Sequence, residues 1–323
     1  MEEQIETMEQ SMDHRSVRGN DAPTVSPYPE ARTSMLITPQ AGCGACGSSG
    51  ETPGPSANDA GISSYVYAIG RAEARFPNLA AEKEFAQATG RTDTTGKTDQ
   101  QTFHAVLSKT ENRYLVRQLC WVLSIQGLDT YLLLPRNPMD IDLLVQAIRP
   151  AYSPNDIDVV IGMRGPIAPP TMCNGLMVPI VVFDQIYSFD RGTLINEIPR
   201  PAKTTASQFG PTAEELFNRI MQLTDNAGAT DEHRALNYLA MRYPAIYSKA
   251  AEQFALDFSL SGVEVRTSPL NSTRKIVDVI FAYTNRKNDF TEKFYVRVDV
   301  TEEFPFLVTK MSPYYDREIR GVR

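Results

Sequence analysis

The stretch DIDVVIGMRGPIAPPTMCNGLMVPIVVFD, residues 156–184, decides the fold. Its two apolar runs, 157–163 and 176–183, are short, rich in Val and Ile and nearly free of charge, which is typical of strands covered on both faces. We therefore expect them at the centre of a sheet. Between them, 165–175 contains three prolines and two glycines, which prevent regular pairing and hold Cys173 in a stiff loop. Functional sites are often built on such loops.

On the N-terminal side of this stretch, the pattern alternates between strand and helix. We expect a strand at 65–69, helices at 78–89 and 99–108, a hairpin of 115–126 with 128–134, and a short helix at 141–148. Asn78 follows a proline and suits the N-cap of the first helix. Gln126 and Gly127 suit a tight hairpin turn, because the glycine supplies a positive φ. Cys120 and Val122 share one face of the first arm.

On the C-terminal side, a helical layer precedes a second hairpin. We expect helices at 214–223, after Thr230 and from Pro244, within a layer at 211–258, with Pro211 in a first helical turn. Strands follow at 276–283, 293–301 and 306–310. The inward residues of the hairpin are Val277, Val279, Phe281, Tyr283, Phe294, Val296, Val298 and Val300. The fold class is therefore α+β, with an antiparallel or mixed sheet, hairpins at both ends and a helical layer.

The N-terminal region has a different composition from the rest. Residues 1–40 are polar and proline-rich, and 1–30 hold seven acids against two arginines, so we predict a disordered acidic arm. Residues 41–63 are rich in Gly, Pro and Ser and are expected to be a linker, with the folded domain at 64–323. The rest of the chain is nearly neutral, which argues against nucleic acid as a partner. The sequence also lacks the long apolar run that a membrane span or a signal peptide would need. We therefore expect a cytoplasmic protein.

The four cysteines are the candidate metal ligands. Cys43 and Cys46 form a Cys-x-x-Cys pair flanked by glycines, and Cys120 and Cys173 could complete a tetrahedral site of four thiolates. Such a structural zinc site would fix the linker to the body. Two alternatives stay open: a redox or disulfide role for the Cys43/Cys46 pair, or unconnected cysteines that act as small buried apolar residues. In a long cytosolic chain, free thiols or metal ligands are favoured over a disulfide framework.

Catalytic motifs are sparse. His14, His104 and His233 are the three histidines, and His233 lies in a charged helix start that favours a surface position. There is no nucleophile elbow, P-loop, dinucleotide-binding glycine motif or His-Glu-x-x-His zinc motif. An enzyme would need a site around the 165–175 loop with Cys173, Asp184 or His233.

A binding surface is the remaining candidate. Arginines that could contact an acidic peptide are Arg164, Arg191, Arg200, Arg242, Arg317, Arg320 and Arg323. Most of these arginines are equally well explained as ordinary surface residues that keep loops soluble. Exposed strand edges could also accept an extended peptide.

Several long strings give the sequence a family resemblance. They include YVYAIGRAEARFPNLAAEKEFAQATGRTDT (65–94), ENRYLVRQLCWVLSIQGLDTYLL (111–133) and TDNAGATDEHRALNYLAMRYPAIY (224–247). Over 64–317 the chain resembles the C-terminal domain of unknown function of cyanobactin maturation proteins of the PatA/PatG type. In that family the domain follows a subtilisin-like protease that cleaves, or cleaves and macrocyclises, a ribosomal precursor peptide.

The resemblance implies a role in the assembly of ribosomal cyclic peptides. It indicates an accessory, non-catalytic domain that binds or organises the precursor peptide, the subtilisin-like maturation protease, or a second copy of itself as a homodimer. No subtilisin catalytic context occurs in this chain. The alternatives are an enzyme acting on the precursor peptide, or a fragment of a PatG-type protease or macrocyclase whose catalytic domain is absent here.

Overall fold

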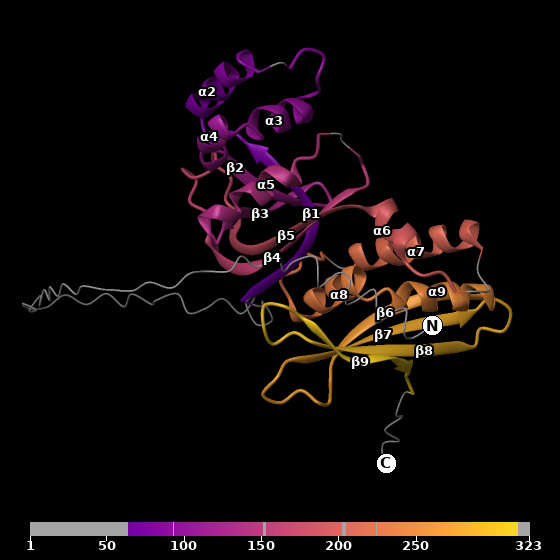
Figure 1. The fold of residues 1–323 in the computed structure, drawn as a ribbon. Coiled ribbons are helices and arrows are strands. Elements are labelled where there is room, and N and C mark those ends of the chain that lie inside the picture. The colour runs from indigo at the N-terminus through magenta and orange to yellow at the C-terminus, as the bar shows by residue number, and fades with distance from the viewer. Residues whose placement is uncertain (1–63, 93, 151–152, 202–204, 224, 316–323) are drawn as a thin grey trace, which may run out of the picture. The chain divides into compact units, whose positions relative to one another are not determined.

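The computed structural model describes residues 64–315, apart from residues 93, 151–152, 202–204 and 224 (Figure 1). In this part of the chain the strands are β1 (Tyr65–Arg75), β2 (Cys120–Ile125), β3 (Leu128–Pro135), β4 (Asp156–Ile167), β5 (Pro179–Asp190), β6 (Phe258–Thr267), β7 (Ile276–Asn285), β8 (Thr291–Asp299) and β9 (Phe306–Pro313). The helices are α2 (Leu79–Gly90), α3 (Asp99–Leu107), α4 (Arg113–Gln118), α5 (Ile141–Ala147), α6 (Arg191–Glu197), α7 (Ala206–Met221), α8 (Asp231–Arg242) and α9 (Ala245–Ala255). These helices and two sheets confirm the α+β class.

The first sheet closes into a five-stranded barrel in the order β1-β2-β3-β5-β4. The two runs of the deciding stretch pair with each other: β4 is antiparallel to β5, and it also pairs with β1. However, β5 begins only at Pro179, and closure leaves no central strand. The pair approaches closely at Gly162, where a β-carbon would lie 2.4 Å from the carbonyl oxygen of Val182. A larger residue would push the two strands apart.

Helices α2–α5 pack with residues from the barrel strands in one apolar cluster. The predicted N-cap of α2 is confirmed, because Asn78 accepts a hydrogen bond of 2.9 Å from the backbone N–H of Ala81. The expected strand at 115–126 is wrong in its first part, where α4 forms instead. Leu115 and Val116 are buried on this helix, and Val116 accepts a 2.9 Å hydrogen bond from the Trp121 indole. A short apolar run fits helix and strand equally well, and packing decided between them.

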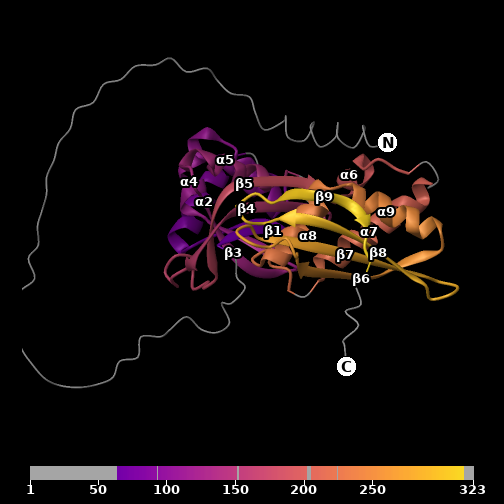
Figure 2. The ribbon, with the colours of Figure 1, turned by 90° about the horizontal axis from the view of Figure 1, so that it is seen from below.

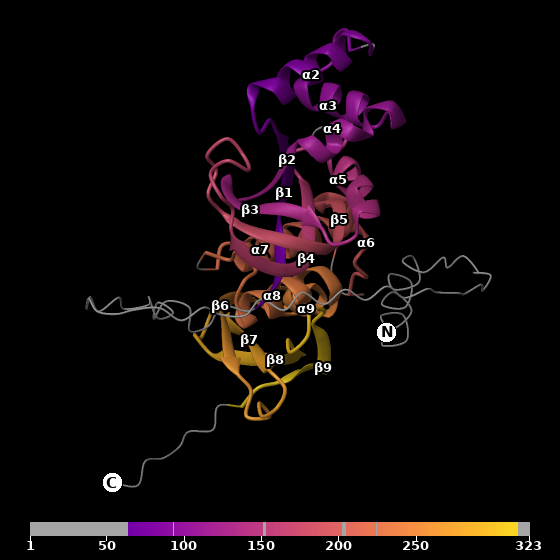
Figure 3. The ribbon, with the colours of Figure 1, turned by 90° about the vertical axis from the view of Figure 1, so that its left-hand side faces the viewer.

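Helices α7–α9 lie between the barrel and the second sheet (Figures 1 and 3). The caps of α8 and α9 agree with the sequence: Thr230 accepts from the backbone N–H of His233, and Pro244 precedes α9. Two details differ. Pro211 lies inside α7 rather than in its first turn, because α7 begins earlier, at Ala206. The short helix α6 was not expected.

The second sheet has the order β6-β7-β8-β9, and Figure 2 shows these strands beside the helical layer. The expected hairpin is confirmed, since Val279 pairs with Val296 and Phe281 with Phe294. These residues face the core that the sheet shares with α7–α9. Strand β6 was missed, because a register shift between Leu260 and Gly262 interrupts its alternation and the helical layer was expected to continue to residue 258. Strand β9 was expected at its first residues and extends to Pro313.

Candidate functional site

The β4–β5 loop folds back over the outer face of β2 and β3. Cys173 in this loop forms a disulfide with Cys120 of β2, with their α-carbons 5.8 Å apart. Both cysteines are buried in a small apolar cluster that also contains Val122 and Leu132, as the shared face of Cys120 and Val122 predicted. The loop is therefore held on the barrel by a covalent bond and by apolar packing.

Two of the four expected zinc ligands thus lie together, but as a disulfide rather than as thiolates. Cys43 and Cys46 lie outside the described residues. In the described ranges no group of three or more His, Cys, Asp or Glu residues is arranged to hold a metal. The zinc site of Cys43, Cys46, Cys120 and Cys173 stays a prediction, and it would require reduction of the Cys120–Cys173 bond because cysteine binds zinc as a thiolate and not as a disulfide.

The other residues suggested for the loop site have separate partners. Asp184 of β5 forms a 2.9 Å ion pair with Arg136, which also lies 3.4 Å from a carboxylate oxygen of Glu303. His233 lies in the first turn of α8, where its backbone N–H donates to the cap residue Thr230. The structure therefore gives Cys173, Asp184 and His233 three different structural environments.

Arg234 of α8 anchors the loop between β8 and β9. Its side chain is 0% exposed, and its guanidinium donates hydrogen bonds to the carbonyl oxygens of Val300 at 2.7 Å, Glu303 at 3.3 Å and Glu302. Burial lowers the pKa of Arg234, while the carboxylate of Asp231, 3.4 Å away, opposes that shift. The sequence analysis did not single out this residue. Arg234 stabilises the fold rather than offering a free cation.

A second buried network joins α8 to strand β1. The Asn237 amide donates to the carbonyl oxygen of Tyr67 at 2.7 Å, and the Asn226 amide donates to the Asn237 side-chain oxygen at 2.7 Å. Gly228 has a φ of +71°, and a β-carbon there would lie 2.3 Å from the Tyr67 carbonyl oxygen. Only glycine fits this close approach. The string TDNAGATDEHRALNYLA therefore encodes the junction between barrel and helices.

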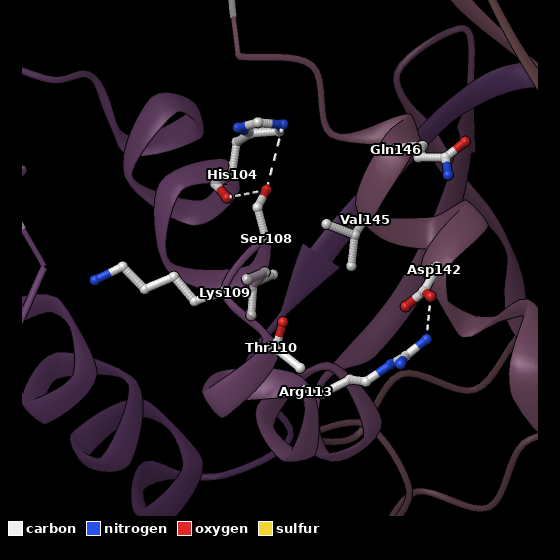
Figure 4. Close-up of a pocket in the computed structure, with 9 residues that line it drawn as sticks. His104, Ser108, Lys109, Thr110, Arg113, Asp142, Val145 and Gln146 are labelled. Carbon is white, nitrogen blue, oxygen red and sulfur yellow. Dashed lines mark hydrogen bonds and ion pairs between the residues drawn. The ribbon is translucent and has the colours of Figure 1, made fainter.

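An open cavity of about 300 Å³ lies where α3, α4 and α5 meet (Figure 4). Its lining residues are His104, Leu107, Ser108, Lys109, Thr110, Arg113, Asp142, Val145 and Gln146. Arg113 forms an ion pair with Asp142 among these lining residues. The volume suits one side chain or one end of a peptide, at the lower end of typical ligand sites. We call this space the α3–α5 cavity.

A Ser, a His and an Asp line the α3–α5 cavity, but they do not form a proton relay. Ser108 Oγ lies 3.4 Å from His104 Nε2, yet it donates its proton to the His104 carbonyl oxygen at 2.6 Å. Asp142 pairs with Arg113 rather than with His104. Burial lowers the pKa of His104, which favours the neutral imidazole. This arrangement suits binding better than nucleophilic catalysis.

The sequence analysis considered His104 only as a packed or surface residue and did not select Arg113 or Asp142. The i, i+4 spacing of His104 and Ser108 was the one local signal available. Among the described helices, none is long and apolar enough to cross a membrane.

Comparison with known proteins identifies the C-terminal half of the described chain. Residues 203–314 match the family model described as PatG C-terminal, a range that includes α8, α9 and the sheet β6–β9. A solved structure titled "PatG Domain of Unknown Function" superposes with a TM-score of 0.64 at 20% identity, covering 78% of this chain and 99% of that chain. At this identity the likeness shows a common fold. No curated protein matches. The chain therefore contains a PatG C-terminal domain, as its resemblance predicted.

Proposed function

We propose that this chain is an accessory, non-catalytic binding domain in cyanobactin biosynthesis. It acts in the cytoplasm and binds the precursor peptide, the subtilisin-like maturation protease, or both. The observation that carries the proposal is the α3–α5 cavity, where Lys109 and Gln146 offer donor groups, Arg113 pairs with Asp142, and Ser108 donates its proton to the His104 carbonyl oxygen. The match to the PatG C-terminal family supports the choice of pathway.

The edges of the second sheet support a peptide as one partner. Strands β6 and β9 are the edge strands of that sheet, so within the described residues each has a neighbouring strand on one side only, and an extended chain could pair on the other. Phe304 and Phe306 beside the β9 edge are exposed, and Arg274 lies over the Phe306 ring with 4.9 Å to its centroid. Exposed aromatic and arginine side chains are common in protein interfaces.

The experiment is a pull-down of the full chain with precursor peptide and with the maturation protease, followed by mass spectrometry of the peptide. We expect at least one of the two to be retained, with no change in peptide mass. If neither the precursor peptide nor the protease is retained, the proposal is refuted. A changed peptide mass in the absence of protease would instead support the enzyme hypothesis, and Ser108→Ala would then test the cavity as its site.

Two further expectations belong to this proposal. A structural zinc held by Cys43, Cys46, Cys120 and Cys173 predicts about one zinc per chain in elemental analysis of reduced protein, because four thiolates complete one tetrahedral site. A Cys43→Ser/Cys46→Ser variant should then lose it. The expected homodimer is tested by the solution mass, where a strict monomer at high concentration would contradict it.

A further inference from the structure

We propose that the α3–α5 cavity recognises a carboxylate of an acidic peptide, with Arg113 as its principal contact. This inference rests on the proposed peptide-binding function and names the chemistry of one recognised group. The carboxylate belongs either to an Asp or Glu side chain or to a peptide C-terminus, since both present the same planar pair of oxygens.

The charge of the cavity favours an anion. Its charged lining residues, with His104 neutral, are Lys109, Arg113 and Asp142, so the cations exceed the anion by one. In Figure 4 the Lys109 side chain extends away from the Arg113–Asp142 pair. Its long flexible stem allows that charge to approach an occupant. A bound monoanion would neutralise the excess.

Arg113 offers a donor that the protein does not use. Its Nη2 pairs with Asp142, but its Nε is buried and has no hydrogen-bond partner among the described residues. A buried donor without an acceptor is unfavourable, and a carboxylate oxygen would remove this penalty when the guanidinium turns toward it. Arginine binds carboxylates through its planar fork of N–H groups, so the ligand would compete with Asp142 for the guanidinium.

The remaining lining fits the body of an acidic residue. Leu107 and Val145 provide apolar wall for methylene groups, while the Thr110 hydroxyl and the Gln146 amide can donate to a second oxygen. Ser108 does not compete for this role, because its proton is already donated to the His104 carbonyl. The cavity therefore combines a cation that a ligand can share with Asp142, neutral donors and a small apolar surface.

The test uses three N-acetylated synthetic hexapeptides of Gly, Ala and Ser, measured against the full chain by calorimetry at about 50 mM salt, where charge pairs are weakly screened. One peptide carries an internal Glu and an amidated C-terminus. The second has no acid and a free C-terminus. The third carries Gln in place of Glu and an amidated C-terminus. We expect one or both acidic peptides to bind at least about tenfold more tightly than the neutral one. The first two peptides distinguish the two sources of the carboxylate.

Matched variants tie the binding to the cavity. Arg113→Gln should weaken the acidic peptide about tenfold. Arg117→Gln, an exposed arginine on the same helix, should leave binding unchanged. Asp142→Asn should tighten binding, because it removes the internal competitor for Arg113. Thermal unfolding of each variant checks that the fold is retained.

The outcomes separate this inference from the proposed function. Equal affinity for all three peptides, or full affinity in Arg113→Gln, would overturn the carboxylate site even if the pull-down retains the precursor peptide. Retention of neither precursor nor protease would refute the proposed function, while the hexapeptide affinities would still decide whether the cavity takes a carboxylate.

Discussion

Two arginines hold the loop between β8 and β9, and they do so with different chemistry. Arg234 donates to main-chain carbonyls of Val300, Glu302 and Glu303 from a fully buried position. Arg136 comes from the barrel, is 43% exposed, and pairs with the carboxylates of Asp184 and Glu303. Carbonyls do not titrate and carboxylates do. The first anchor should therefore be strong and independent of pH, whereas the second should be weaker and sensitive to pH.

The charges around Glu303 explain the expected sensitivity. Its side chain is only 13% exposed. Burial and the neighbouring Asp184 raise the pKa of Glu303 to about 7, although Arg136 opposes the shift. A carboxyl whose pKa is raised on folding binds more protons in the native than in the unfolded state between pH 4.5 and 7. Its contribution to stability therefore falls as the pH rises through that window.

The largest expected effect comes from removing the stronger anchor. Arg234→Met should lower the free energy of unfolding by about 3 kcal/mol or more, because several buried carbonyl oxygens would lose their donor. Urea unfolding at pH 6 and pH 8 measures this, and the loss should be similar at both. Arg117→Met, on an exposed surface, is the control. A loss below about 1 kcal/mol would show that the carbonyl anchor is not the stronger of the two.

A third, uncharged anchor sharpens the comparison. Asn237 binds Tyr67 and Asn226 through neutral hydrogen bonds alone. Asn237→Leu should destabilise the protein by about 2 kcal/mol, since it removes the side-chain donor to the Tyr67 carbonyl oxygen and both hydrogen bonds between Asn237 and the buried Asn226 amide. The same unfolding measurement should give an equal loss at pH 6 and pH 8. If the loss of stability in Asn237→Leu depended clearly on pH, the pH dependence could not be assigned to Glu303 and its partners alone.

Weakening the carboxylate anchor should have a smaller effect that grows with pH. Arg136→Gln removes the cation that Asp184 and Glu303 share, and with it the interaction that lowers the pKa of Glu303. We expect a loss of about 1 kcal/mol at pH 6 and a larger one at pH 8, where a larger fraction of Glu303 is ionised. An equal loss at both values would mean that the arginine acts through packing alone.

The smallest effect on stability should come from Glu303→Gln, which tests the pH dependence directly. The amide cannot ionise, so the melting temperature of this variant should change less between pH 5.5 and pH 8 than that of the parent protein. At pH 8 the variant should match or exceed the parent. Glu302→Gln, an exposed neighbour, should keep the parent's profile. Identical profiles for Glu303→Gln and the parent would place the titrating group elsewhere.

Much of the fold follows from periodicity in the sequence. The alternation in 276–283 and 293–301 identified the inward residues of the second hairpin, and Asn78 and Thr230 identified the starts of α2 and α8. These signals are local, because a strand of period two or a capped helix shows its buried face within a few residues. The helix α4 and the edge strand β6 were missed, because their apolar patterns are short or broken.

The candidate site could not be derived in the same way. Arg113, Asp142 and His104 meet in the cavity only because α3, α4 and α5 pack together, and a charged residue in the sequence looks the same whether it lies on a surface or on a cavity floor. The burial of Arg234 likewise depends on a loop about seventy residues away supplying carbonyl oxygens. The proximity of Cys120 on β2 to Cys173 in the β4–β5 loop goes with the pairing of β3 with β2 and β5, which are far apart in the sequence.

The sequence alone determined the α+β class, the principal helices and strands, and the kinship to the PatG C-terminal family. Only the tertiary structure decided that the first sheet closes into a barrel, that Arg234 is a structural anchor, and that an open cavity contains Arg113. The physical reason is the range of the interactions. Periodicity and caps act between neighbours in the chain, whereas barrel closure, buried charge and cavity shape arise from segments that meet only in the packed molecule.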